Sequence, residues 1–248
     1  MSPLVSVITA CYNSELTIEK TILSILSQTY DFIEYIIIDG NSTDRTLEII
    51  KKYENKFLAR GYKYIIVSEN DEGIADAWNK GLSFARGEII GILNADDYYD
   101  EVAVEVAVRK LNVTLPELSY GVCHKLNSKG GVQINNVKFN PRKIYYNLSF
   151  SHTTCFQTKV IFDVLGNFDK KYKIAFDVDF LLRAWKRNIC FISNDNITYM
   201  LSGGVSDKQR VDAIKEYRNA LIENGFNKQL AHLFCFIKLI YYYWKIKK

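Results

Sequence analysis

The first hundred residues alternate between short apolar runs and longer stretches in which apolar positions recur at helical spacing. The apolar runs are rich in β-branched residues and cover residues 4–10, 35–39, 64–68 and 89–93. Runs of this kind are typical of strands that are buried on both faces. The helical stretches between them cover residues 16–30, 47–53 and 74–85. This order predicts an α/β fold with a mostly parallel, doubly wound central sheet flanked by helices.

The remainder of the chain has a weaker periodicity. We expect a hairpin or mobile loop over residues 127–140, strands at 118–125 and 150–156, and helices at 102–111, 159–165, 180–186 and 208–224. Asn13 or Ser14 is the expected N-cap of the first helix, and Gly166 and Gly225 each end a later one. A chain of 248 residues suits one main domain, which we place at residues 1–225, followed by a C-terminal segment, 226–248.

Carboxylates follow three successive strands of the predicted sheet. Asp39 follows the second strand, Asp71 the third, and Asp96 and Asp97 the fourth. Because parallel strands end at one edge, where ligands bind, we expect these acids to converge. Two adjacent carboxylates repel each other unless a divalent cation or a cationic partner lies between them, so we expect at least one to bind a ligand. The alternative is that one of them caps a helix beginning near Asp100.

The C-terminal segment differs in character from the rest of the chain. Residues 230–248 are crowded with large apolar side chains, include three consecutive tyrosines and Trp244, and close with three lysines among the last four residues. His232 and Lys238 interrupt the apolar run, which is too short to predict a membrane span. Aromatic residues combined with lysines favour an interfacial helix on an anionic membrane. The alternative is a terminal helix packed on the core or on another subunit.

Composition and charge narrow the range of function. The net charge of +4 is modest and has no clustered basic stripe, which argues against nucleic acid as a partner. Five scattered cysteines without a C-x-x-C pair predict reduced thiols in a cytosolic compartment, and argue against a zinc site or a disulfide framework. No basic region precedes the first apolar run, so we predict no signal peptide.

The loop after the first strand excludes two other classes of nucleotide-binding enzyme. It has the sequence Cys-Tyr-Asn-Ser at residues 11–14. A Rossmann dehydrogenase needs G-x-G-x-x-G here, so that the pyrophosphate can approach the start of the helix. A nucleotidyltransferase of similar shape would need a loop rich in glycine and lysine, which is also absent.

Five motifs in order resemble those of family 2 glycosyltransferases with the GT-A fold, and the resemblance runs nearly end to end. The motifs are VSVITACYN from residue 5, IDGNSTD from 38, DEGIADAWNKG from 71, LNADD from 93 and AFDVD from 175. The resemblance implies a nucleotide-binding half at residues 1–100, an acceptor-side half at 101–225, and a membrane-proximal helix at 226–248.

The resemblance also implies a nucleotide-sugar pocket. Its expected residues are Thr9, Tyr12, Asp39, Asp71, Asn79, Asn94, Ala95 and Asp96. Tyr12 would lie against the base or ribose, and Asp39 would accept a hydrogen bond from the uracil N–H. The alternatives are that Asp39 braces its loop and that Asp71 caps the helix that begins after it.

Roles in metal binding and catalysis follow from the same resemblance. A Mn²⁺ or Mg²⁺ ion would bridge Asp96 and the diphosphate of the donor. Asn94 replaces the first acid of the D-x-D motif, and Asp97 is the residue that could compensate. Asp177 is the implied general base. Asp179 would brace its helix, and Arg183 would hold Asp179 or a phosphate. His152 would approach the donor phosphates or the acceptor; the alternative is a structural role.

The expected reaction is an inverting transfer of glucose or galactose from a UDP-sugar to a lipid-linked acceptor. We expect GlcNAc-diphospho-undecaprenol as the acceptor, a β-1,3 linkage, and a role in O-antigen and lipopolysaccharide biosynthesis. The enzyme would act as a peripheral protein on the cytoplasmic face of the bacterial inner membrane. One alternative is transfer from UDP-GlcNAc or UDP-GalNAc in capsule or exopolysaccharide assembly. Another is a non-catalytic nucleotide-sugar-binding subunit, which Asn94 would permit.

Overall fold

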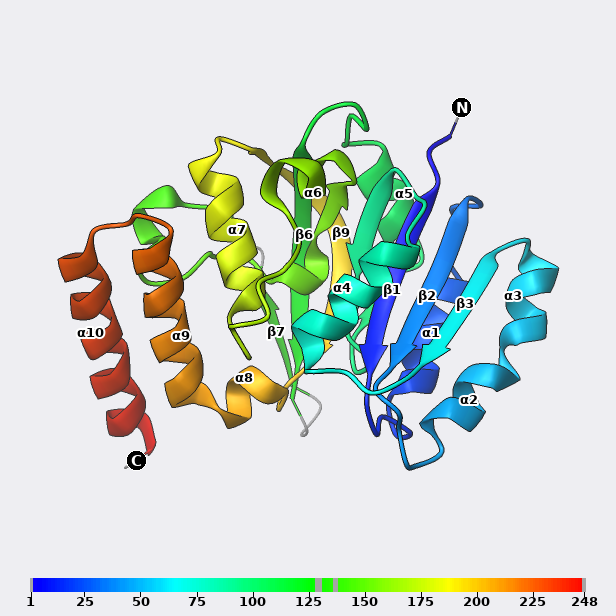
Figure 1. The fold of residues 1–248 in the computed structure, drawn as a ribbon, viewed down its shortest axis with the longest axis horizontal. Coiled ribbons are helices and arrows are strands. Elements are labelled where there is room, and N and C mark those ends of the chain that lie inside the picture. Colours follow the sequence, from blue (N-terminus) through cyan, green and yellow to red (C-terminus); the bar gives the residue numbers. More distant parts are fainter. Residues whose placement is uncertain (1, 128–130, 136–137, 247–248) are drawn as a thin grey trace.

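The computed structural model describes residues 2–127, 131–135 and 138–246 (Figure 1). The described strands form one sheet in the order β3-β2-β1-β4-β8-β6-β9-β5, and β7 pairs with β6. The strands are β1 (Val5–Cys11), β2 (Ile33–Asp39), β3 (Lys63–Ser68), β4 (Ile89–Ile92), β5 (Tyr98–Tyr99), β6 (Glu117–Leu126), β7 (Val132–Asn135), β8 (Phe156–Thr158) and β9 (Cys190–Leu201). The helices are α1 (Ile18–Leu26), α2 (Thr46–Lys52), α3 (Glu54–Arg60), α4 (Ile74–Phe84), α5 (Ala103–Val108), α6 (Val160–Leu165), α7 (Phe176–Lys186), α8 (Val205–Lys208), α9 (Arg210–Glu223) and α10 (Lys228–Ile246), with 3-10 turns η1 (Pro141–Lys143) and η2 (His152–Thr154).

Strands β1 to β4 form a parallel unit, as the apolar runs predicted. Strands β2 and β4 pair with β1, and β3 pairs with β2. Alternate side chains enter two separate cores, because successive residues of a strand point to opposite faces. Ile8 and Ile36 pack against α4 on one face, whereas Val7 and Ile37 pack with α1, α2 and α3 on the other. Figure 1 shows α4 in front of the sheet and α1 behind it.

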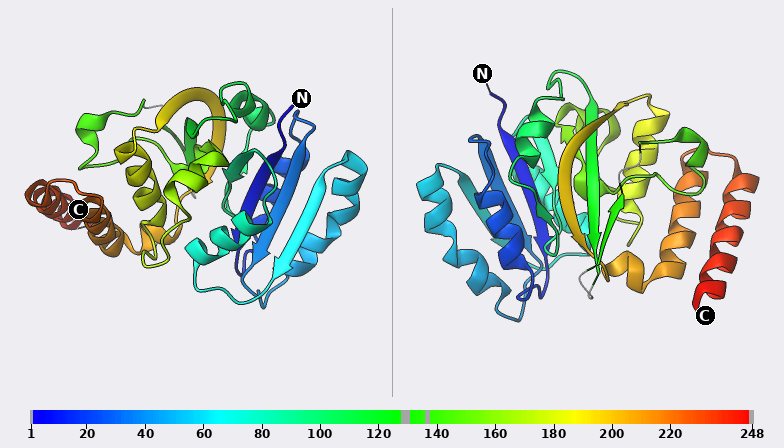
Figure 2. Two further views of the ribbon diagram at one scale, coloured as in Figure 1. Left: turned by 45° about the horizontal axis from the view of Figure 1, so that its top comes forward. Right: turned by 180° about the vertical axis from the view of Figure 1, so that it is seen from behind.

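The second half of the sheet is mixed and curls. Strand β8 runs antiparallel to both β4 and β6, and β9 runs parallel to β6. Strands β6 and β9 therefore share the direction of β1 to β4. The long, curved β9 also pairs with β5 and so draws the sheet around (Figure 2). The predicted fold class, an α/β protein with a mostly parallel central sheet flanked by helices, is confirmed.

Two predictions for the second half were wrong. Residues 150–156 are not a strand: η2 occupies their centre, because Thr154 bonds to the Ser151 carbonyl through both its hydroxyl and its backbone N–H. Strand β9 was not predicted, because Asn194, Asp195 and Asn196 at its centre have the composition of a turn. The structure instead buries Asn194 and Asn196 at an irregularity in the β6–β9 pairing.

The predicted hairpin within residues 127–140 is confirmed where the structure describes it. Strand β7 pairs antiparallel with β6, from Cys123 opposite Asn135 to Leu126 opposite Val132. Residues 128–130 and 136–137, which belonged to the same prediction, lie outside the described residues.

The C-terminal helices form the end of the molecule farthest from β3 (Figures 1 and 2). Helix α9 packs on α7, and α10 packs on α9 through Ala231 and Cys235, which are buried. The opposite face of α10 is exposed and apolar. Within residues 2–127, 131–135 and 138–246, no helix is long and apolar enough to cross a bilayer.

One edge of the molecule brings together several element ends. In the view of Figure 1, the carboxyl ends of β1, β2 and β3 point to the lower edge. Helix α8, the N-terminal ends of α7 and α9 and the C-terminal end of α10 lie along the same edge. The carboxylates that the sequence singled out therefore lie on the side of the molecule where helix N-termini contribute positive potential.

Candidate active site

The loops after β1 and β2 are joined by hydrogen bonds across the site. Asn13, at a φ of 47°, accepts a hydrogen bond of 2.9 Å from the backbone N–H of Thr43 and donates one of 2.9 Å to Ser42 Oγ. Asn13 or Ser14 was predicted to cap α1, and this was wrong for both: α1 begins only at Ile18, with Thr17 at the N-cap position. The side chain of Asn13 instead fixes one loop against the other.

Asp39 is fully buried at the end of β2. Its carboxylate accepts hydrogen bonds from the hydroxyl and the backbone N–H of Ser42 and, at 2.6 Å, from Ser68 Oγ. These contacts brace the loop and tie β2 to β3, which is the arrangement that the loop-bracing alternative describes. A contact between Asp39 and a uracil N–H stays a prediction.

Tyr12, Gly40 and Asp71 meet at the outer part of this edge. A Cβ atom at Gly40 would lie 2.6 Å from Asp71 Oδ2 and 3.5 Å from the ring of Tyr12, so only glycine permits this approach without displacement. Asp71 Oδ1 accepts a hydrogen bond of 2.9 Å from the N–H of Gly73 at the start of α4. One oxygen of Asp71 therefore braces the helix while the other lies beside Tyr12, whose side chain is 61% exposed.

Three of the acids lie around the end of β1. Burial, and then the charges of Asp39, Asp44 and Asp71, raise the pKa of the Cys11 thiol, which places these three acids around the end of β1. The sheet order puts β3 three strand spacings from β4, or about 14 Å. Among the described residues, no three His, Cys, Asp or Glu side chains gather as a metal site. The loops share one edge, as predicted, and the convergence of Asp96 with Asp39 and Asp71 stays a prediction.

Asp97 is a buried hydrogen-bond acceptor that joins three segments. It is 1% exposed and accepts hydrogen bonds from Thr153 Oγ1 at 2.9 Å, Asn94 Nδ2 at 3.1 Å and the N–H of Leu201 at 3.2 Å. Burial and the neighbouring charge of Asp96 raise its pKa to about 7. Because both oxygens already have donors, Asp97 holds the loop after β4 against η2 and β9.

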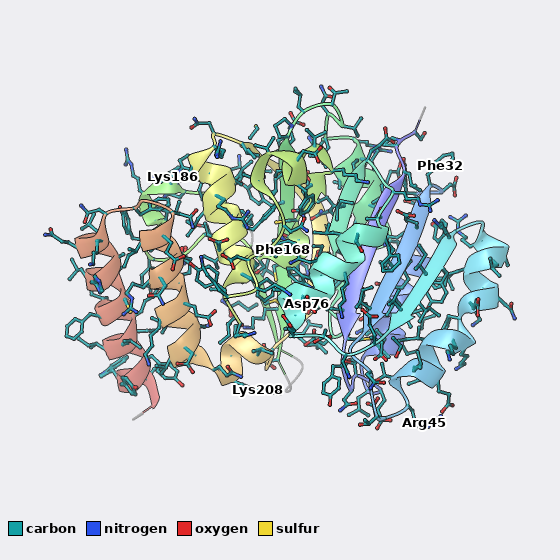
Figure 3. The ribbon with its side chains drawn as sticks, in the orientation of Figure 1. Phe32, Arg45, Asp76, Phe168, Lys186 and Lys208 are labelled. Carbon is teal, nitrogen blue, oxygen red and sulfur yellow. The ribbon has the colours of Figure 1, made fainter. Side chains whose placement is uncertain are left out.

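The carboxylate of Asp96 differs from that of Asp97 in its hydrogen bonding. Among the described residues, no other residue donates a hydrogen bond to its side chain, which is partly exposed. Burial raises its pKa, and the positive charge of Lys208 at the end of α8 opposes that shift. The capping alternative was wrong for both acids, because β5 follows them and α5 begins only at Ala103. The lower edge and Lys208 are seen in Figure 3.

The residues around Asp96 fit a shared divalent cation. Mg²⁺ and similar ions are commonly held by one or two carboxylates together with substrate phosphates and waters. Asp96 offers one such carboxylate without a competing donor. The side-chain amide of Asn94 donates a hydrogen bond to Asp97. Ala95 is buried and carries no ligand atom in its side chain. A cation here would therefore need oxygens from a diphosphate.

Asp177 lies in the first turn of α7, within the acceptor-side half. Its Oδ1 accepts a hydrogen bond of 2.8 Å from the N–H of Val178, the only such donor among the described residues. Burial raises its pKa to about 6. Glu216 of α9 fixes the preceding backbone by accepting hydrogen bonds from Ile174 and Ala175, each of 2.8 Å. Asp177 thus presents a second oxygen whose basicity suits proton transfer near neutral pH.

Arg183 is held by the scaffold. Its Nε lies 2.9 Å from Asp179 Oδ2, as predicted for this pair, and its two other nitrogens donate to the carbonyls of Leu165 and Asn167. Asp179 also accepts a hydrogen bond from Asn224 at 2.8 Å. The guanidinium therefore braces α7, and its expected alternative contact, with a phosphate, stays a prediction.

His152 is buried in an aromatic cluster. It is 4% exposed and stacks on Trp78 with ring centroids 5.1 Å apart. Burial lowers its pKa to about 4, so the ring is neutral at physiological pH. Within the described part of the chain, neither of its nitrogens has a hydrogen-bond partner. The predicted contact of His152 with phosphate or acceptor is not tested by this arrangement.

Two further predicted pocket residues make structural contacts. Asn79 exchanges hydrogen bonds of 2.8 and 3.0 Å with the backbone of Phe168, and Thr9 is buried with its hydroxyl bonded to Tyr35 at 3.1 Å. Phe168 marks the contact between the two halves of the molecule in Figure 3. Any contact of Asn79 or Thr9 with a nucleotide stays a prediction.

Three residues near the site were not found from the sequence. Lys208 lies close enough to Asp96 to oppose the rise of its pKa. The charge of Asp177 acts on Tyr217, which is half-buried and whose ring contacts the ammonium of Lys238. The last helices were interpreted as an amphipathic helix and a C-terminal appendage, whose charged residues ordinarily face solvent. No local pattern in the sequence marks them, because their contacts join separate helices.

Comparison with known proteins identifies the family. Residues 6–170 match the sequence model described as "Glycosyl transferase family 2". The chain belongs to this family. It is a glycosyltransferase, and the predicted family and enzyme class are confirmed.

Relatives of this glycosyltransferase have diverse names. It is 28% identical over 233 residues to the chondroitin synthase of Pasteurella multocida, covering 92% of this chain but 24% of that protein. The chain therefore spans about a quarter of that relative's length. It is 25% identical over 233 residues to a PGL/p-HBAD biosynthesis glycosyltransferase of Mycobacterium bovis, covering 92% of this chain and 84% of the relative.

Solved structures share its fold at low sequence identity. The mannosyltransferase PcManGT of Pyrobaculum calidifontis, in complex with GDP-Man and Mn²⁺, matches with a TM-score of 0.71 and 20% identity, over 94% of this chain and 69% of that chain. S. aureus TarS, in complex with UDP-GlcNAc, matches with a TM-score of 0.63 and 21% identity, over 94% of this chain and 70% of that chain. These likenesses support the GT-A-like architecture.

Proposed function

We propose that this glycosyltransferase moves a hexose from a UDP-sugar, with inversion, to a lipid-linked saccharide. The observation that carries the proposal is that the loops holding Tyr12, Asp71 and Asp96 and the start of α7, which holds Asp177, lie along one edge of the molecule. Tyr12 follows β1 and Asp96 follows β4, and these two strands are neighbours in the sheet, so a nucleotide diphosphate could reach from one loop to the other. The base would lie at Tyr12 and Asp71, the diphosphate at Asp96, and the sugar toward Asp177.

The diphosphate end would be neutralised by cations. Asp96 would hold Mn²⁺ or Mg²⁺ together with diphosphate oxygens, and Lys208 beside it would contribute a second positive charge. With such an ion held by Asp96, the site would gain a Lewis acid that stabilises the charge of departing UDP. The presence of Mn²⁺ in the PcManGT complex supports a metal in this fold.

Asp177 would act as the general base. Its free oxygen would take the proton from the acceptor hydroxyl. The hydroxyl oxygen would attack the anomeric carbon at the same time, while the bond from that carbon to the diphosphate breaks. A single in-line displacement inverts the anomeric configuration. Burial favours this role, because it raises the pKa of Asp177 to about 6 and so makes the carboxylate a stronger base.

The identities of the donor sugar, the acceptor and the linkage are the most specific part of the proposal. We propose UDP-glucose or UDP-galactose, with UDP-GlcNAc or UDP-GalNAc as the alternative that the TarS complex supports. The chondroitin synthase supports a role in bacterial surface polysaccharide. Within that class, we propose a GlcNAc-diphospho-undecaprenol acceptor, a β-1,3 linkage and O-antigen assembly, with capsule or exopolysaccharide assembly as the alternative.

Helix α10 supports a lipid acceptor and a peripheral position on the cytoplasmic face of the inner membrane. Its exposed face carries Leu233, Phe236, Ile237, Ile240, Tyr241, Tyr243 and Trp244, each 43–62% exposed. Its C-terminal end reaches the edge that holds Asp177 (Figure 1). Aromatic and aliphatic residues on one face of a helix bind the interfacial region of a bilayer.

A donor screen with a matched variant tests the proposal. UDP-glucose, UDP-galactose, UDP-GlcNAc, UDP-GalNAc and GDP-mannose would each be incubated with a short-chain GlcNAc-diphosphate lipid and Mn²⁺. We expect transfer from one UDP-hexose, and a loss of at least a hundredfold in rate for Asp177→Asn. Asp163→Asn, an exposed carboxylate on α6, is the control. An unchanged rate for Asp177→Asn would overturn the assignment of the base.

A further inference from the structure

Lys238 of α10 occupies an unusual position for a lysine. Its ammonium lies 4.0 Å from the ring centroid of Tyr217 on α9 and 5.2 Å from that of Tyr146. The side chain is half-buried, and no carboxylate of the described residues lies within ion-pair distance of it. Cation–π contacts with two tyrosines stabilise the ammonium but leave its net charge uncompensated.

Arg210 is the first residue of α9 and lies two turns before Tyr217, on the same face of that helix. Burial, and then the charge of Arg210, lower the pKa of Lys238 to about 8. Arg210 has one ion pair among the described residues, a long contact of 3.7 Å with Asp207, and Asp207 is already paired with Lys125 at 2.9 Å. Lys238 is half-buried, whereas the side chain of Arg210 is 52% exposed and can turn toward a ligand. An anion that contacts both cations would remove the repulsion between them.

The two cations lie on the acceptor side of the site. Glu216, the neighbour of Tyr217 on α9, accepts hydrogen bonds of 2.8 Å from the backbone of Ile174 and Ala175, just before Asp177. Burial, and then the charge of Asp177, raise the pKa of Tyr217, as this proximity implies. The hydroxyl of Tyr217 donates to the Ile144 carbonyl at 2.6 Å, which fixes its ring. The donor diphosphate, by contrast, would lie at Asp96 and Lys208. Lys238 and Arg210 are therefore available to a second anion.

We propose that Lys238 and Arg210 bind the diphosphate that joins the acceptor saccharide to its lipid. This inference rests on the proposed function and assigns a site to the anionic part of the acceptor. The saccharide would then extend toward Asp177. The lipid chain would follow the exposed apolar face of α10, the helix to which Lys238 belongs. The order of groups in the acceptor, sugar then diphosphate then hydrocarbon, matches the order of Asp177, the two cations and α10.

Kinetics with two acceptors test the site. One acceptor is a short-chain alkyl GlcNAc-diphosphate, and the other is the alkyl GlcNAc glycoside without phosphate. For Lys238→Met, which keeps the aliphatic packing on the tyrosines, we expect the KM of the diphosphate acceptor to rise about tenfold or more, by the loss of one charged contact. The change for the phosphate-free acceptor should be at least several-fold smaller. Arg210→Gln should behave in the same way, and exposed Lys228→Met at the start of α10 should change neither KM.

A binding measurement separates this inference from the proposed function. Calorimetric titration with a short-chain alkyl diphosphate that lacks a sugar requires no turnover. We expect affinity to fall about tenfold in Lys238→Met and to be unchanged in Lys228→Met. Equal affinities of wild type and Lys238→Met, or equal KM changes for both acceptors, would overturn the phosphate site. Loss of affinity without any transfer to the diphosphate acceptor would retain the site and reject the proposed acceptor reaction.

Discussion

His152 and Trp78 stack with ring centroids 5.1 Å apart, and both side chains are 4% exposed. The stack joins η2 to α4, and Trp78 continues it with edge contacts to Phe168 and Phe176, the residue before Asp177. The contact therefore connects the nucleotide-binding half of the molecule to the helix of the proposed base through buried rings.

The burial of His152 predicts a pH dependence of stability. Its pKa is lowered to about 4, so between about pH 6.5 and pH 4 the unfolded chain binds a proton that the folded chain does not. Stability from this group is present above pH 6.5 and is lost as pH falls through that window. We expect His152→Phe, which keeps the stack, to remove on the order of 2 kcal/mol of the loss between pH 7 and pH 5. Denaturant unfolding at both pH values measures this, and an unchanged difference would contradict it.

The raised pKa of Asp177 predicts how the rate of transfer falls at acid pH. A base must be deprotonated to act, and burial raises the pKa of Asp177 to about 6. We expect kcat/KM for transfer to be half-maximal near pH 6 and to fall about tenfold for each further pH unit. Initial rates at saturating metal, measured in Asp163→Asn as the control, check the profile. A profile that is flat from pH 7 to pH 5 would exclude Asp177 as the base.

Asp96 and Asp97 should differ in the effects of their substitution. Asp97→Ala leaves the donors of Asn94, Thr153 and Leu201 without their acceptor, so we expect about 2–4 kcal/mol of lost stability. Asp96→Asn should leave the unfolding free energy nearly unchanged and reduce transfer at least a hundredfold, because its carboxylate is proposed for the metal. Thermal unfolding and initial rates of both variants would decide, and the reverse pattern would refute the division of roles.

Removal of divalent metal tests the same part of the proposal. We expect EDTA to abolish transfer by the wild type and Mn²⁺ or Mg²⁺ to restore it, since the donor diphosphate needs neutralisation as UDP departs. Initial rates against free metal concentration measure the requirement. Full activity in EDTA would remove the metal from the mechanism and leave Lys208 as the cation beside Asp96.

Gly40→Ala should weaken donor binding without unfolding the protein. The new Cβ would lie 2.6 Å from Asp71 Oδ2, the free end of a side chain that can move aside. We expect an increase of about five- to tenfold in the KM for UDP-sugar, corresponding to about 1 kcal/mol, and a small change in melting temperature. Gly204→Ala, where a Cβ meets open space, is the matched control. Equal KM values for the two variants would contradict the pocket.

The exposed face of α10 predicts membrane binding. Phe236 and Ile240 lie one turn apart and are 62% and 53% exposed, so serine at both positions should not disturb the core. We expect the double variant to lose at least tenfold in partitioning to vesicles that contain anionic phospholipid, because each side chain contributes about 1.5 kcal/mol or more when buried. Cosedimentation measures this, with Leu115→Ser, exposed far along the chain, as the control. Unaltered binding would contradict the interfacial helix.

The predictable part of the fold follows from local signals. The runs at residues 4–10, 35–39, 64–68 and 89–93 are long enough and apolar enough to specify β1 to β4 without knowledge of their neighbours. Parallel strands then fix which loops share an edge, so the place of Asp39, Asp71 and Asp96 followed from the order of elements alone. Strand β9 could not be predicted in this way, since its central residues have the composition of a turn. Asn194 and Asn196 are buried there by pairing with β6, some seventy residues earlier.

The sequence by itself determined the α/β class, the edge that carries the acids and the family to which the chain belongs. It could not assign different roles to Asp96 and Asp97, which are adjacent and chemically identical. Only the tertiary structure decided that difference, because the donors that bury Asp97 come from Thr153 and Leu201, which are distant in sequence. The same holds for Lys238, whose environment is made by Tyr217 and Tyr146 on other segments. Whether a side chain is available to a ligand depends on contacts with residues distant in sequence, and the local pattern of residue types does not encode those contacts.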